Sequence, residues 1–115
     1  MASSHARALD RMKLIEQNLR DLESDKQEAK TLLDSLRQSM QGFRNKRREL
    51  RQQGVIDHTD QRVEKLNKDQ DALSESLRKG EELLLDIMQR INDSEILKAR
   101  IQLSISHFLP DTNRG

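Results

Sequence analysis

The sequence predicts an all-α fold: a long antiparallel coiled-coil hairpin of two helices that assembles into a larger helical bundle. Three observations favour it: an apolar seven-residue repeat in each half of the chain, one cluster of turn-forming residues between the halves, and a composition typical of solvated helices. Of the 115 residues, 36% are charged and 2% aromatic, with one proline and four glycines. We therefore expect a single helical domain over residues 1–115.

The first helix is predicted over about residues 5–52. Apolar residues recur there at alternating spacings of three and four, which places them on one face, and only Lys26 and Arg47 interrupt this seam. A seam of this length would extend roughly 65 Å at 1.5 Å per residue, so its burial requires a second long helix. The seam positions are Ala8, Met12, Ile15, Leu19, Leu22, Lys26, Ala29, Leu33, Leu36, Met40, Phe43, Arg47 and Leu50.

The turn is expected at residues 53–57. Gly54 is well placed to end the first helix, because glycine accepts the left-handed backbone conformation that closes a helix. Asp57 or Thr59 is expected to cap the next helix, with Asp60 in its first turn, where a negative charge interacts favourably with the helix dipole. The hairpin tip could be a recognition element or could simply close the coiled coil, and the sequence favours neither interpretation.

The second helix is predicted over about residues 58–109, with a disordered tail at 110–115 because Pro110 stops the helix. Gly80 is its weakest point and permits an alternative, a three-helix bundle broken near that residue. We favour a continuous helix, because the heptad phase is the same on both sides of Gly80. The seam positions are Ile56, Thr59, Val63, Leu66, Gln70, Leu73, Leu77, Gly80, Leu84, Ile87, Ile91, Ser94, Lys98, Ile101, Ile105 and Phe108.

The two seams also predict how the helices align. With a tight turn near Gln53, apolar residues face apolar residues, as in the pair Leu33 and Leu73, and polar interruptions also meet. A slide of one heptad would place Arg47 on Leu66, Lys26 on Ile87 and Ile15 on Lys98. Because burying a charge against apolar groups costs kilocalories, the first alignment is favoured.

A basic segment precedes the turn. Its five basic residues are Arg44, Lys46, Arg47, Arg48 and Arg51. They could contact phosphates or an import factor, because closely spaced cations add up locally. A solvated helix face with Arg47 in the seam is the favoured interpretation, since no aromatic residues are interleaved for base stacking and the net charge is only +1. Nucleic acid is therefore not the expected partner.

No reaction chemistry is expected. His5, His58 and His107 are too widely spaced for a helical metal pair, and the chain has no cysteine. The sequence contains neither a nucleophile elbow nor a glycine-rich phosphate loop. We therefore expect no enzyme activity, no catalytic or metal-binding residues and no cofactor.

Apolar residues exceed a single seam between Leu83 and Leu109, and helical partners should pack there, with Leu9, Met12 and Leu14 opposite. In the favoured alignment the last seam residues also run past the start of the first helix and lack partners. The predicted partner-binding residues are Leu83, Leu85, Met88, Ile96, Leu97, Ile101, Leu103, Ile105 and Phe108.

The sequence thus favours a non-enzymatic structural or adaptor subunit that forms a homo-oligomer or joins another helical protein, most simply as a four-helix bundle. The alternative is a nucleic-acid or chaperone-like binder that uses the segment Arg44–Arg51. The longest purely apolar run has three residues, so no transmembrane segment or signal peptide is expected. We expect a cytoplasmic protein, or a nuclear one if the basic segment directs import.

Overall fold

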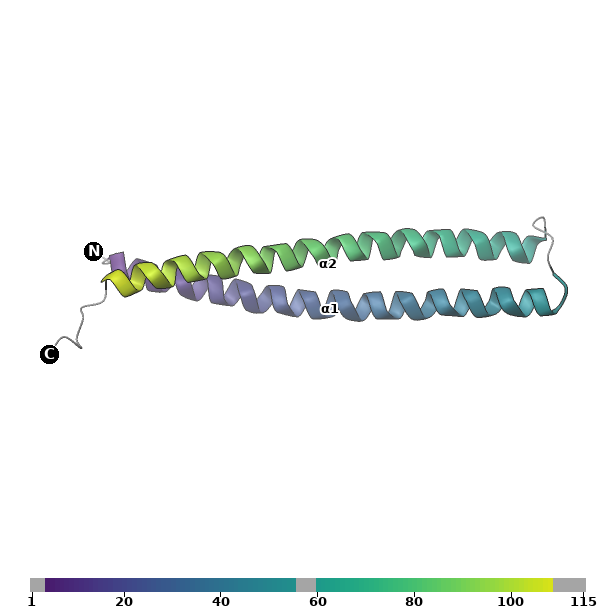
Figure 1. Ribbon diagram of the computed structural model, residues 1–115, viewed down its shortest axis with the longest axis horizontal. Helices are drawn as coiled ribbons and strands as arrows, with labels where there is room; N and C mark the ends of the chain where they lie inside the picture. The colour runs from purple at the N-terminus through teal and green to yellow at the C-terminus, as the bar shows by residue number, and fades with distance from the viewer. Residues whose placement is uncertain (1–3, 56–59, 109–115) are drawn as a thin grey trace. The chain divides into compact units, whose positions relative to one another are not determined.

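The chain forms two long helices in the computed structural model, which describes residues 4–55 and 60–108. Helix α1 spans Ser4–Gln52 and helix α2 spans Gln61–Phe108. They form an antiparallel hairpin, and the described ranges contain no strand (Figure 1). The predicted all-α, two-helix antiparallel hairpin is confirmed.

Helix α2 is continuous through Gly80, so the alternative three-helix bundle is wrong. Within the described ranges only Gly54 has a positive φ, and Gly80 keeps the helical conformation of its neighbours. This agrees with the unchanged heptad phase around Gly80.

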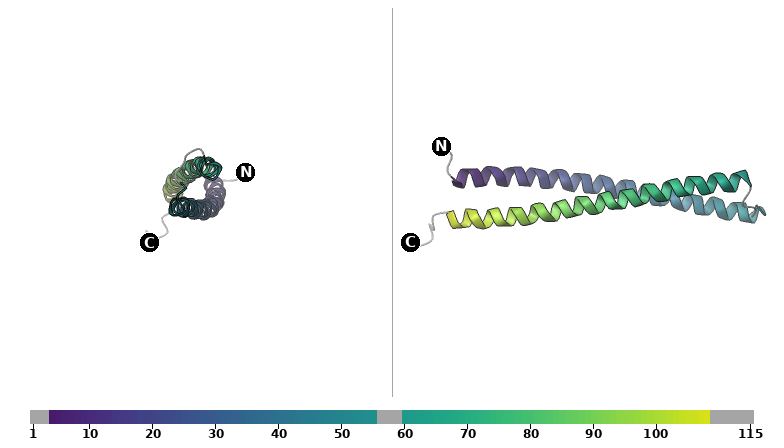
Figure 2. Two further views of the ribbon diagram at one scale, coloured as in Figure 1. Left: turned by 90° about the vertical axis from the view of Figure 1, so that its right-hand side faces the viewer. Right: turned by 90° about the horizontal axis from the view of Figure 1, so that it is seen from above.

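The chain divides into two compact units, which are described separately. The turn unit is Gln27–Leu85, and the terminal unit combines Met1–Lys26 with Asp86–Gly115. In each unit a segment of α1 and a segment of α2 lie side by side, as the views in Figures 1 and 2 agree. Each unit therefore has its own core where the two segments meet.

The predicted seams form these cores. Apart from Phe108, whose side chain lies outside the described residues, every predicted seam position that the structure describes is buried or half-buried in both helices. In the turn unit the most buried seam residues are Ala29, Leu33 and Leu66, and in the terminal unit they are Met12, Leu22, Ile87, Ile91 and Ile101. Ile56 and Thr59 lie outside the described residues. The heptad analysis therefore identified the buried face of each helix correctly.

Helix α1 ends at the predicted glycine. Gly54 has a φ of +80°, its N–H donates to the Arg51 carbonyl at 3.0 Å, and the Val55 N–H donates to the Leu50 carbonyl at 2.8 Å. These two bonds are the pair of a Schellman motif and satisfy carbonyl groups at the helix end. The prediction that Gly54 caps α1 is confirmed.

Helix α2 starts later than predicted. Asp60 is its cap: the Arg62 N–H donates to Asp60 Oδ1 at 2.9 Å, and the Glu64 N–H donates to the Asp60 carbonyl at 3.0 Å. Asp60 was expected inside the first turn, so that prediction is corrected. Asp57 and Thr59, the expected caps, lie outside the described residues. The connection between the helices is therefore longer than a tight turn at Gln53.

The longer connection changes the alignment of the helices by one heptad. In the turn unit Leu33 packs on Gly80 and not on Leu73, because a Cβ added at Gly80 would lie 2.8 Å from Leu33 Cδ2. In the terminal unit, which shows the same alignment, Asn18 Nδ2 donates to Ser94 Oγ at 3.2 Å. The alignment that the sequence favours, with Leu33 facing Leu73, is therefore wrong. The structure has the alternative alignment, shifted by one heptad, which was disfavoured because it places Arg47, Lys26 and Lys98 opposite apolar residues.

Charged seam residues tolerate this alignment because they are not fully buried. Arg47 is half-buried, and its guanidinium donates to the side-chain oxygens of Asn67, at 2.8 Å, and of Gln70. Lys98 is also half-buried, with its Nζ 3.9 Å from a carboxylate oxygen of Glu16. Long cationic side chains lay their stems along apolar surface and keep the charge near water. The desolvation cost expected from the sequence therefore does not arise.

Because Gly80 has no side chain, it leaves space for Leu33 between the helices. Leu33 is 1% exposed, the lowest value among the buried apolar residues of the described chain. The Leu33 side chain occupies the volume that a Cβ at Gly80 would take. Gly80 is therefore a packing residue in a continuous helix, where close packing against Leu33 excludes an added methyl group.

A cross-link can test this alignment. We expect the pair of changes Leu33→Cys and Gly80→Cys to form an intramolecular disulfide, because a Cβ at residue 80 would lie 3.6 Å from Leu33 Cγ, near the sulfur of the new side chain. The control combines Leu33→Cys with Leu73→Cys, which lies roughly 10 Å further along α2. Mobility on non-reducing gels reports the bond. Preferential bonding in the control would restore the alignment favoured from the sequence.

Alanine substitutions at two helical glycines should have opposite effects. Gly80→Ala should lower the free energy of unfolding by about 1 kcal/mol: Leu33 is almost fully buried and has little room to shift, so the cost of overpacking exceeds the gain in helix propensity. Gly42→Ala should raise it by about 0.5–1 kcal/mol, since an added Cβ there meets no atom within 4 Å. Urea unfolding of both variants measures the difference. Equal stabilisation by both changes would contradict the Leu33 contact.

Candidate functional site

The predicted partner-binding residues differ in exposure. Six side chains are exposed: Leu83 (52%), Leu85 (67%), Met88 (44%), Ile96 (45%), Leu97 (40%) and Leu103 (64%). Ile101 is only 8% exposed and Ile105 is half-buried, so both belong to the core of the terminal unit. The side chain of Phe108 lies outside the described residues. The expectation that the last seam residues lack partners is therefore wrong for Ile101 and Ile105.

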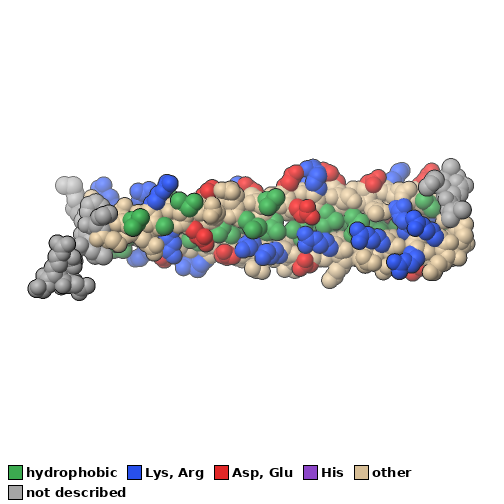
Figure 3. All heavy atoms as spheres, viewed as in Figure 1, with side chains coloured by type: hydrophobic (Ala, Val, Ile, Leu, Met, Phe, Trp, Pro, Cys, Tyr) green, Lys and Arg blue, Asp and Glu red, His purple; other side chains and the backbone are tan. Residues whose placement is uncertain are grey.

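Three of the exposed residues lie on one line of α2 in the terminal unit. At about 100° per residue, Met88, Ile96 and Leu103 fall within about 80° of one another, together with the exposed residues Asn92 and Ala99. We call these five residues the outer stripe. It lies roughly 140° around α2 from the seam of this unit. Figure 3 shows hydrophobic side chains on the exposed surface of α2 in this unit.

Leu85 lies at the same angle around α2 as the outer stripe but belongs to the turn unit, whereas the other exposed leucines lie on different faces. Leu97 is on the opposite edge of the seam from the outer stripe, at the position that precedes a seam residue in the heptad. Leu83 has the same heptad position in the turn unit. Leu32 of α1 is 53% exposed there as well and was missed by the sequence analysis, although it directly precedes Leu33 in a Leu-Leu pair. The sequence signal that could have identified Leu32 is a leucine directly beside a seam position, where a heptad pattern expects a polar residue.

Three residues of α1, which the sequence predicts on the same surface, also differ in exposure. Leu9 and Leu14 are exposed, at 41% and 72%, whereas Met12 is 7% exposed. At about 100° per residue Leu9 and Leu14 face directions roughly 140° apart. Among the described residues of the terminal unit, the exposed apolar side chains therefore share a face on α2, where Asn92 interrupts them, and lie singly on α1.

The five basic residues of the predicted segment do not form one cluster. Arg44, Arg48 and Arg51 are exposed, and their spacing of four and then three residues puts them on one face of α1. Arg47 instead lies between the helices, where it donates to Asn67 and Gln70. Lys46 lines a shallow depression on a different side of α1. The basic surface is therefore a row of three arginines.

The depression beside Lys46 lies within the turn unit and has a volume of about 280 Å³. Its lining residues are Phe43, Lys46, Glu49, Leu50, Gln53, Arg62, Lys65, Leu66 and Asp69. Ligand pockets of proteins usually enclose about 300–1,000 Å³ and contain a few convergent polar groups. Here three cations and two carboxylates are mixed around an apolar floor, so their charges largely offset one another and select no ligand.

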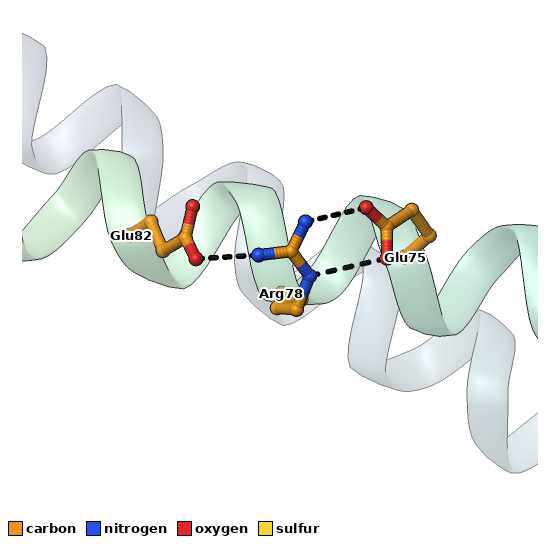
Figure 4. Close-up of polar contacts among 3 residues, drawn as sticks. All are labelled: Glu75, Arg78 and Glu82. Carbon is orange, nitrogen blue, oxygen red and sulfur yellow. Dashed lines mark hydrogen bonds and ion pairs between the residues drawn. The ribbon is translucent and has the colours of Figure 1, made fainter.

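The shortest ion pairs among the described residues are on the exposed surface of α2. The Arg78 guanidinium contacts the Glu75 carboxylate at 2.5 and 3.1 Å and the Glu82 carboxylate at 2.5 Å (Figure 4). The hydrogen bond from Arg78 lowers the pKa of Glu75 and raises the pKa of Arg78 above its ordinary value. These contacts join residues three and four apart on one helix, as structural helix-surface pairs do.

A similar contact lies at the start of α2. Side-chain and backbone hydrogen bonds from Arg62 lower the pKa of Asp60. The Asp60 carboxylate caps the helix in its charged form, so its perturbation has a structural explanation. Both shifted carboxylates, Asp60 and Glu75, are therefore explained by contacts that stabilise α2.

In residues 4–55 and 60–108 no group of three or more His, Asp or Glu side chains is placed to hold a metal ion. His58 and the side chain of His107 lie outside the described residues. The described helices include none that is long and apolar enough to cross a membrane.

Comparisons with known proteins give no match: no protein-family model fits the sequence, and no curated protein or solved structure is similar to it.

Proposed function

We propose that the protein is a non-enzymatic structural or adaptor subunit that assembles with other helices through the exposed apolar side chains of α2. The observation that supports this proposal is the concentration of six exposed large apolar residues between Leu83 and Leu103. Single exposed leucines are common on soluble proteins, whereas large apolar side chains that share one face of a helix, as Met88, Ile96 and Leu103 do, favour an interaction surface. Assembly would remove these side chains from water.

The remaining surface is suited to a helical partner. Long helices present ridges and grooves that other helices fill at interaxial distances of about 8–10 Å. A four-helix bundle would cover the apolar residues and leave surface ion pairs such as Arg78 with Glu75 and Glu82 in water. The proposed function is therefore structural: the protein would hold helical chains together and would need no cofactor.

The proposed function can be tested by a variant in which all six exposed residues become glutamine. We expect the wild-type chain to form dimers or larger complexes in sedimentation equilibrium, or to cross-link to a helical partner at these residues. The six-fold variant should lose both, while its circular dichroism spectrum stays helical because glutamine is a good helix former. A wild-type chain that forms no complex and gives no cross-link at these residues would refute the proposal.

A second candidate function is polyanion binding by the arginine row. Arg44, Arg48 and Arg51 are all exposed on one face of α1, and no ion pair is formed by them within the described residues. Phosphate contacts by such a row would weaken steeply with salt. Binding of duplex or single-stranded oligonucleotides, measured by fluorescence anisotropy at increasing salt, tests this function. Replacing the three arginines with glutamine should abolish binding, and Lys46→Gln is the matched control.

A further inference from the structure

We propose that the outer stripe pairs two copies of this chain, with the α2 helices antiparallel across a two-fold axis near Ile96. This inference rests on the proposed function and names the partner, a second copy. The stripe is Met88, Asn92, Ile96, Ala99 and Leu103, all exposed in the terminal unit. The large residues of the stripe are at its two ends and its middle.

The spacing of the stripe is symmetric about its middle. The midpoint lies between Glu95 and Ile96: Met88 precedes it by the same number of residues as Leu103 follows it, and Asn92 and Ala99 are related in the same way. In an antiparallel pair each Met88 therefore meets Leu103 of the second copy, and each Asn92 meets the small Ala99. A two-fold symmetric interface requires this kind of self-complementarity: if one residue contacts a second residue across the interface, the same contact also forms with the two copies exchanged.

A parallel pairing would match these side chains less well. Ala99 would face Ala99 and leave space between the helices, while the bulkier residues would face their own copies. In the antiparallel pair the larger Asn92 fills the space beside Ala99. Small residues opposite larger ones let helix surfaces interdigitate, which is the requirement of close helix packing.

Charges on one edge of the stripe are also complementary in the antiparallel pair. Asp93 and Arg100 both lie on the same side of the stripe, roughly 80–100° around α2 from its middle line. Reversing the second helix brings Asp93 of each copy close to Arg100 of the other, so the contact forms twice. Asp93 already accepts a hydrogen bond from Gln89 at 2.9 Å, which leaves its second carboxylate oxygen for this contact.

The first experiment measures the oligomeric state of the full chain by sedimentation equilibrium, from micromolar to submillimolar concentrations. We expect wild-type dimers and a monomeric variant with Met88→Gln, Ile96→Gln and Leu103→Gln. The matched control carries Leu83→Gln and Leu97→Gln, which are exposed outside the stripe, and should still dimerise. Loss of dimers in the control but not in the stripe variant would overturn this inference and leave the proposed function intact.

Charge reversal provides a second, independent readout. Asp93→Arg alone and Arg100→Asp alone should each weaken the dimer by roughly 3- to 30-fold, as expected for two exposed ion pairs per dimer. The double variant should restore wild-type affinity, because both pairs form again with the signs exchanged. A merely structural role for these residues gives no such rescue, so additive weakening in the double variant would contradict the proposed pairing.

Cross-linking determines the orientation. A protein with Met88→Cys mixed with a protein with Leu103→Cys should form a disulfide-linked dimer, while Met88→Cys alone should not. Disulfide formation by Met88→Cys with itself would indicate parallel helices and overturn the inference. A wild-type chain that stays monomeric would also overturn it, whereas the proposed function would fail only if cross-links to any helical partner were also absent.

Discussion

Leu33→Ala should lower the free energy of unfolding by about 2–5 kcal/mol, the range for truncating a buried leucine. We expect a value in the upper half of that range. Leu33 is 1% exposed and packs on Gly80, which has no side chain that could move into the space left behind. Folded proteins of this size are stable by only roughly 5–15 kcal/mol, so the loss would be a large part of the total.

The neighbouring leucine provides the matched control. Leu32 is 53% exposed, and Leu32→Ala should change the free energy of unfolding by no more than about 0.5 kcal/mol. Urea unfolding followed by circular dichroism measures both variants, at a concentration where the wild-type chain is monomeric, because assembly would add to the apparent stability. Similar losses for the two changes would contradict the burial of Leu33 against Gly80.

The buried faces of both helices could be predicted from the sequence, whereas their alignment could not. Heptad spacing depends only on residues within one helix, and it identified seam residues such as Leu22 and Ile91 correctly. A slide of one heptad leaves these faces unchanged, so the choice depends on the turn and on individual contacts. The capping residues expected from the sequence, Asp57 and Thr59, would start α2 too early, whereas α2 begins at Gln61, after the Asp60 cap.

Two further residues explain why the sequence favoured the wrong alignment. Arg47 was treated as a charge that must lose its water, yet it is half-buried and bonded to two side-chain oxygens of α2. Gly80 was treated as a weakness of the helix, yet it accommodates Leu33. A pair of helices has little interior, so long polar side chains at the seam reach water and side-chain volume decides the fit.

The candidate site was only partly predictable for the same reason. Exposed residues such as Leu103 were identified from the excess of apolar residues over one seam. Ile101 was assigned to the same partner surface, because the assumed alignment placed it beyond the start of α1. Once the alignment is shifted, Ile101 lies level with Met12, and both are buried. To tell core residues from surface residues near Ile101, one must know the alignment of the two helices. That alignment depends on the turn, which is far from Ile101 in the sequence.

Ile101→Ala should therefore destabilise the hairpin itself, by about 2–5 kcal/mol, because a buried isoleucine is truncated in the core of the terminal unit. Ile101 is 8% exposed, whereas Leu103, two residues later, is 64% exposed. Leu103→Ala is the matched control: it should change the free energy of unfolding of the monomer by about 0.5 kcal/mol or less. Chemical unfolding at low protein concentration measures both variants.

The same pair of variants separates folding from assembly. At a concentration where Ile101→Ala remains folded, we expect it to dimerise nearly as wild type, because its side chain faces α1 and not the outer stripe. Leu103→Ala should weaken the dimer while leaving the monomer stable. Sedimentation equilibrium and unfolding on the same samples give the two quantities. If Ile101→Ala left stability unchanged and abolished assembly, Ile101 would be a partner-binding residue as the sequence suggested, and the alignment of the helices in the terminal unit would be wrong.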